Sequence, residues 1–134
     1  MFRLLFIDDS KLDHIILDKL IAGIEDFAPV SHSYDGEEAL KSFTDNPADC
    51  PDVIFLDIRM PRFDGWDFLE GFKDLHPALP VKPLLYVFSS SIDPTDRERA
   101  LSYSYVTGFF SKPVSRPVLE LVLAACVERS RLPK

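Results

Sequence analysis

The chain is organised around the segment VIFLDIRMP, residues 53–61. Its first four residues are apolar without alternation, a pattern typical of a strand that is covered on both faces. The acid Asp57 follows directly, at the carboxyl end of this run. Strands of this kind occur in parallel sheets that lie between helices, so the segment predicts a central strand of such a sheet.

Apolar runs and helical patterns alternate on both sides of this segment. Two more strong strands are predicted at 4–7 and 84–88, and two weaker ones at 30–34 and 106–110. The predicted helices span 10–26, 36–45, 64–75, a stretch that begins at the N-cap Asp93, and a last one from the N-cap Ser115 to about residue 131. Five strand–helix units with short connections predict an α/β fold, a doubly wound parallel sheet between two layers of helices.

The first predicted helix is expected to bury the apolar residues that recur every four positions: Leu12, Ile16, Leu20 and Ile24. Its expected water-facing residues are charged: Lys11, Asp13, Asp18 and Lys19. The histidines show no metal-ligand spacing and are interpreted as surface or partly packed residues: His14, His32 and His76. The last helix is apolar on more than one face, which fits either generous burial, with Cys126 in the core, or a partner surface.

The length and net charge of the chain argue against several classes of function. The 134 residues fit one domain, expected to span 1–134 without an output domain. The 22 acids against 15 bases give a net charge of −7, which argues against binding nucleic acid or an anionic membrane. No apolar run approaches the length of a membrane span, and no signal-peptide core precedes Asp8. Two cysteines are too few for a disulfide framework, so a cytoplasmic protein is expected.

Polar residues follow four of the five predicted strands. They are Asp8 and Asp9 after the first, Asp57 after the third, Ser89, Ser90 and Ser91 after the fourth, and Lys112 after the fifth. In open parallel sheets these positions meet at one edge, where ligands bind. Clustered carboxylates favour a hard divalent ion such as Mg²⁺ or Mn²⁺, which would neutralise charge on a transferring phosphoryl group. Asp57 would then be the nucleophile.

The ordered motifs resemble the receiver domain of two-component response regulators, and the match covers essentially the whole chain. They are LFIDDS (5–10), DGEEAL (35–40), IFLDIRMP (54–61) with Asp64-Gly65, FSS (88–90) and GFFSKP (108–113). The resemblance implies a flavodoxin-like, CheY-like three-layer sandwich with five parallel strands in the order 2-1-3-4-5. It also implies a signalling role and no enzyme activity beyond the domain's own phosphotransfer and autodephosphorylation.

The resemblance implies roles for particular residues. Asp57 matches the phosphoacceptor, Asp9 a direct Mg²⁺ ligand, and Asp8 one that acts partly through water. The backbone carbonyl of Arg59 would complete the metal shell with Asp57. Ser89 matches the switch hydroxyl, Lys112 the bridging lysine, Phe109 the aromatic switch residue, and Pro113 a proline whose preceding bond is often cis.

Some positions depart from the family pattern. Ser89 replaces the commoner threonine, Ser90 an alanine, and Phe109 lacks the hydroxyl of a tyrosine, so its switching would rest on packing. Arg59 and Ser91 lie at positions that tune dephosphorylation. The long cation at Arg59 is expected to pair with an acid or to shield the site from water.

The implied partners are a histidine kinase or histidine phosphotransfer protein and a downstream protein target, with a homodimer through the fourth helix, fifth strand and fifth helix as a further possibility. Three alternatives stay open. A phosphohydrolase would need a second acid where Arg59 stands. A flavin-binding module would need a hydroxyl- and glycine-rich loop in place of Asp8-Asp9. A phosphorylation-independent pseudo-receiver would lack some of the acids, hydroxyl and lysine that are all present here.

Overall fold

The computed structural model describes residues 1–91 and 93–131. Its strands are β1 (Leu4–Ile7), β2 (Ser31–Ser33), β3 (Val53–Asp57), β4 (Leu84–Ser89) and β5 (Val106–Ser111). Its helices are α1 (Lys11–Ala22), α2 (Gly36–Asp45), α3 (Gly65–Leu75), α4 (Pro94–Leu101) and α5 (Arg116–Ser130), with a short 3₁₀ turn η1 (His76–Ala78) after α3.

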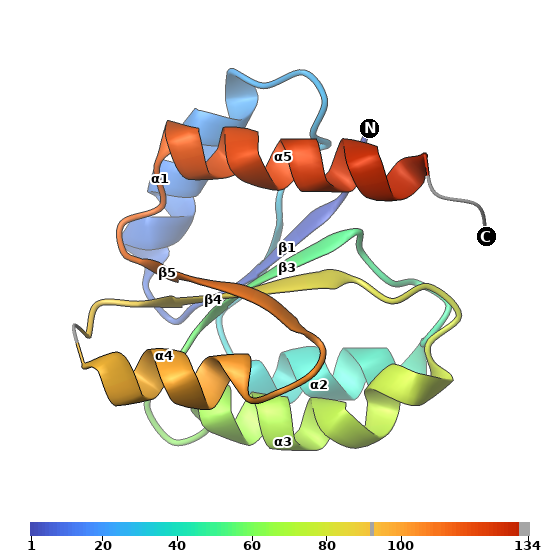
Figure 1. Ribbon diagram of the computed structural model, residues 1–134, viewed down its shortest axis with the longest axis vertical. Helices are drawn as coiled ribbons and strands as arrows, with labels where there is room; N and C mark the ends of the chain where they lie inside the picture. Colours follow the sequence, from blue (N-terminus) through green and yellow to red (C-terminus); the bar gives the residue numbers. More distant parts are fainter. Residues whose placement is uncertain (92, 132–134) are drawn as a thin grey trace.

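The five strands form one sheet in the order β2-β1-β3-β4-β5, and all neighbouring pairs are parallel. Helices α1 and α5 cover one face of the sheet, and α2, α3 and α4 cover the other (Figure 1). This arrangement confirms the predicted doubly wound, three-layer fold and the strand order 2-1-3-4-5. Among the described residues, no helix is both long and apolar enough to cross a membrane.

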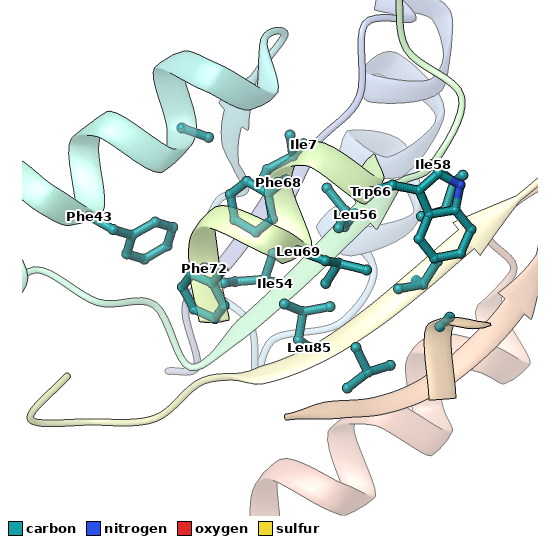
Figure 2. Packing of buried hydrophobic residues seen from close by; sticks show 14 of the residues in the cluster. Ile7, Phe43, Ile54, Leu56, Ile58, Trp66, Phe68, Leu69, Phe72 and Leu85 are labelled. Carbon is teal, nitrogen blue, oxygen red and sulfur yellow. The ribbon is translucent and has the colours of Figure 1, made fainter. Parts of the chain in front are cut away.

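The apolar strands contribute side chains to two separate hydrophobic cores. All five residues of β3 are buried. Val53 and Phe55 belong to the cluster under α1 and α5, whereas Ile54 and Leu56 belong to the cluster under α2 and α3. Figure 2 shows the second cluster, in which side chains from α3 pack onto β3 and β4. A strand that is buried on both faces explains why its sequence is apolar without alternation.

The predicted buried face of α1 is wrong in part. Leu12 and Ile16 are exposed, by 65% and 37%, whereas the residues that α1 buries are His14, Leu17 and Ile21. Positions 14, 17 and 21 lie on one side of a helix with 3.6 residues per turn, and this side faces the sheet. The helix also ends earlier than predicted, at Ala22, where the Gly23 N–H donates to the Leu20 carbonyl.

The predicted helix starts are confirmed at Asp93 and in part at Ser115. Asp93 caps α4 through a 3.0 Å hydrogen bond from the Thr95 N–H. Ser115 occupies the N-cap position of α5, but its side chain accepts no capping hydrogen bond among the described residues. Helix α5 buries Leu119, Val122 and Cys126 and leaves Leu121 exposed.

Candidate functional site

Strand register brings the predicted site residues to one edge of the sheet. Asp57 ends β3 and pairs in register with Phe88, directly before Ser89 at the end of β4. Asp8 follows β1, whose last residue pairs with the residue before Asp57. Lys112 follows β5 and its backbone N–H donates to the Ser89 carbonyl at 2.9 Å. Parallel strands in register therefore place these four residues side by side.

Three carboxylates gather at this edge. One oxygen each from Asp8, Asp9 and Asp57 lies within 4.8 Å of the others, with Asp8 and Asp57 buried and Asp9 exposed. Burial, with the charge of Asp8, raises the pKa of Asp57 to about 7, and burial also raises the pKa of Asp8. Oxygen ligands packed this closely fit a hard divalent cation, which would relieve their repulsion.

Lys112 is shared by three acids. Its Nζ donates to Asp8 at 2.6 Å and to Asp13 at 2.9 Å, and it lies 3.3 Å from Asp57 Oδ1. Burial lowers its pKa, but these acids outweigh the effect and raise the pKa above the usual value for lysine. Asp13 was predicted to face water. Its place in the first turn of α1, close behind Asp8 and Asp9, was the only signal in the sequence.

The loop after Asp57 is held on two sides by arginines. The Arg59 N–H points at Asp57 Oδ1, 3.4 Å away, and its guanidinium donates to Asp96 on α4 at 2.7 Å. This pair confirms the expectation that Arg59 pairs with an acid. Arg62, which has a positive φ of 65°, donates to Asp35 at 2.7 Å and to Glu37 at 2.8 Å, at the start of α2.

A glycine lets α3 begin close against the end of β3. A Cβ at Gly65 would lie 2.7 Å from the Asp57 carbonyl oxygen and 2.7 Å from the Ile58 Cα. Both contacts are with backbone that cannot give way, so a side chain at this position would push the loop away from Asp57. The loop conformation therefore depends on the absence of a side chain at position 65.

Of the two predicted switch residues, Ser89 ends β4 one residue beyond the register partner of Asp57, whereas Phe109 on β5 pairs with Val87. Ser89 is fully buried, and its Oγ accepts the Ser91 N–H at 3.0 Å. Phe109 on β5 is partly buried against the α2–α3 core cluster. The bond between Lys112 and Pro113 is cis, as the resemblance implied.

His14 corrects an expectation from the sequence. It is 2% exposed, and its Nε2 lies 2.7 Å from the Asp8 carbonyl oxygen. Because a carbonyl only accepts, Nε2 carries the hydrogen, and neutral His14 then accepts through Nδ1 from His32, 2.5 Å away. Burial lowers the pKa of His14 and so favours this neutral form. Helical spacing with Leu17 and Ile21 would have identified this histidine as buried.

A doubly wound sheet with an acidic cluster and a lysine at the carboxyl edge defines the CheY-like class of proteins. The family model "Response regulator receiver domain" matches residues 4–124. The chain therefore belongs to the receiver-domain family of two-component response regulators.

Two relatives found by sequence are much longer than this chain. An uncharacterized response regulatory protein of Staphylococcus epidermidis is 30% identical over 130 residues, which are 96% of this chain and 48% of that protein. A protein-glutamate methylesterase/protein-glutamine glutaminase of Escherichia coli is 38% identical over 82 residues, 59% of this chain and 22% of that protein. The chain thus spans about half the length, or less, of these curated relatives.

Solved structures share the fold over nearly the whole chain. A two-component response regulator from Cytophaga hutchinsonii superposes with a TM-score of 0.85 at 24% identity, covering 94% of this chain and 96% of that one. A chain of the CheX-CheY-BeF3-Mg+2 complex from Borrelia burgdorferi gives a TM-score of 0.77 at 25% identity over 92% of this chain and 88% of that one.

Proposed function

We propose that this chain is a phosphoacceptor that takes a phosphoryl group from a phosphohistidine onto Asp57. The observation that carries the proposal is the arrangement at Asp57, a buried carboxylate with two further acids within 4.8 Å and the Lys112 ammonium 3.3 Å away. Asp8, Asp9, Asp57 and the Arg59 carbonyl would hold Mg²⁺ or Mn²⁺. The bound ion supplies positive charge that balances the oxygens of the transferring group.

The transfer needs Asp57 as a carboxylate. One of its oxygens attacks phosphorus, the new O–P bond forms, the N–P bond to the donor imidazole breaks, and the bonding electron pair stays on that nitrogen. Because the pKa of Asp57 lies near 7, Lys112 has a direct role in keeping the anion available. Lys112 can then stay with the phosphoryl oxygens while the leaving imidazole departs.

Phosphorylation would be read through Ser89 and Phe109. The group adds a charge of about −1.5 to −2 and three acceptor oxygens. The Ser89 hydroxyl can donate to one of these oxygens, and Phe109 would follow it inward, since its ring is only partly buried at rest. The altered surface would be recognised by a downstream protein. The chain would turn over no substrate beyond its own phosphotransfer and dephosphorylation.

A protein donor fits the surroundings of the site. Leu12, Ile15 and Ile16 on α1 are exposed, and Ile16 lines the same small depression as Lys112 and Pro113. An apolar surface beside an acidic site suits a histidine kinase or phosphotransfer protein, whereas the net charge of −7 disfavours nucleic acid. A homodimer through α4, β5 and α5 remains part of the proposal, supported by the exposed Leu101 and Leu121.

Labelling with acetyl phosphate tests the proposal. We expect the wild-type chain to gain one phosphoryl group by intact mass only when Mg²⁺ is present, and Asp57→Asn to gain none. Asp45→Asn, which changes an exposed acid at the end of α2, is the matched control and should label normally. Labelling that persists in Asp57→Asn would refute the assignment.

A further inference from the structure

Helix α4 is held to the rest of the molecule largely by polar contacts. Of its eight residues, only Asp96 and Ala100 are buried. Arg99 lies over the Trp66 ring at 4.1 Å, and Arg97 donates to the Phe109 carbonyl at 3.4 Å. Figure 1 shows α4 on the same face of the sheet as α3. With so little apolar burial, the position of α4 depends on its charged contacts.

A third polar contact of α4 is the ion pair between Arg59 and Asp96, at 2.7 Å. The Asp96 side chain is 11% exposed, and Arg59 is its only ion-pair partner in the described part of the chain. A carboxylate this buried is costly without a cation, so the first turn of α4 stays in place while Arg59 remains paired with it. The Arg59 side chain itself is 56% exposed.

A second connection joins the site to α4. The Ser91 N–H donates to Ser89 Oγ at 3.0 Å, and the Asp93 N–H donates to Ser91 Oγ at 3.1 Å. Asp93 is the N-cap of α4. The start of the helix therefore connects both to the switch hydroxyl and, through Arg59, to the loop that follows Asp57.

Phosphorylation would change what surrounds Arg59. Its N–H is already directed at Asp57 Oδ1, so its side chain starts within two residues of the new charge. Guanidinium pairs with phosphoryl oxygens through two parallel hydrogen bonds, and it does so better than with one carboxylate oxygen. Lys112 is already shared by three acids, so it cannot balance the added charge alone.

We propose that Arg59 exchanges partners: it holds Asp96 in the unmodified chain and moves to the phosphoryl oxygens of Asp57 when that residue is modified, which releases the first turn of α4. This exchange rests on the proposed phosphorylation of Asp57. It makes Asp96 a competitor of the phosphoryl group, and it makes α4 the element whose surface changes for a partner.

If Asp96 competes with the phosphoryl group for Arg59, substitutions of Asp96 and of Arg59 should change beryllofluoride binding in opposite directions. Asp96→Asn frees Arg59 and should tighten binding of beryllofluoride with Mg²⁺ about three- to tenfold, whereas Arg59→Gln should weaken it by a similar factor. The double variant should behave like Arg59→Gln alone. Arg62→Gln removes the other arginine of the same loop, which pairs with Asp35 and Glu37 at the start of α2, and is expected to change affinity less than about twofold.

Two readouts separate the exchange from a merely structural role. Fluorescence of Trp66, the single tryptophan, follows binding because Arg99 of α4 lies over its ring. Amide hydrogen exchange over residues 94–101 should rise on beryllofluoride binding in the wild-type chain, and should already be raised without it in Asp96→Asn. Effects of the same sign in the two single variants, or unchanged exchange in α4, would overturn the proposal. A wild-type chain that neither labels nor responds to beryllofluoride overturns the proposed function and the exchange together.

Discussion

Burial of the Asp57 carboxyl beside Asp8 lowers the stability of the folded chain at neutral pH. Its pKa is 3.8 in an unfolded chain and about 7 here, because it is buried beside Asp8. Between these values the folded chain binds the extra proton, so stability falls as pH rises from about 4 to 7. We expect Asp57→Asn to raise the free energy of unfolding at pH 8, without divalent ions, by roughly 2–4 kcal/mol. Urea unfolding with a chelator present measures this change in the free energy of unfolding.

The pH dependence distinguishes this explanation from a general gain in packing. The advantage of Asp57→Asn should shrink towards pH 4.5, where the wild-type carboxyl is protonated in the folded chain. Asp45→Asn supplies the baseline, since that acid is exposed. An equal advantage at both pH values would contradict the buried carboxylate as the cause.

The sequence predicted the residues that gather at the carboxyl edge of the sheet but not the acids that pair with them. Asp8, Asp9, Asp57 and Lys112 end strands or follow them directly, and their positions follow from a parallel sheet in register. Asp13 contacts Lys112 across 99 residues of sequence, and Asp96 contacts Arg59 across 37. Beyond the place of each acid in the first turn of its helix, the sequence carries no signal of these contacts, because each exists only after the helices have packed.

At the level of elements, burial decides how well a strand could be predicted. The interior strand β3 was predicted at 53–56 and spans Val53–Asp57, since its apolar run is continuous. The edge strand β2 was predicted at 30–34 and spans only Ser31–Ser33, with polar and largely exposed residues. An exposed strand at the sheet edge needs no apolar run, so the hydrophobic pattern does not indicate where it begins and ends.

Helix α1 offers a matched test of the corrected face. Leu17 is fully buried and Leu12 is 65% exposed, on the same helix and with the same side chain. Leu17→Ala should lower the free energy of unfolding by about 2–5 kcal/mol through lost burial and a cavity. Leu12→Ala should change it by no more than about 0.5 kcal/mol. Chemical denaturation measures the free energy of unfolding of both variants. Comparable losses would show that the face with Leu12 and Ile16 is the buried one.

At the scale of the whole molecule, the proposed binding of a divalent ion by the acids at the sheet edge would be coupled to folding. A ligand that binds only the folded chain stabilises it, by about 1.4 kcal/mol at ten times its Kd, and this corresponds to roughly 4–6 °C in Tm for a domain of this size. We therefore expect Mg²⁺ to raise Tm in thermal scans. Asp9→Asn, at an exposed ligand position, should abolish the rise, and Asp45→Asn should keep it. Because a chain of net charge −7 is also stabilised by screening, NaCl of equal ionic strength is the reference. A rise that NaCl reproduces, or that Asp9→Asn retains, would show that this cluster does not bind the ion.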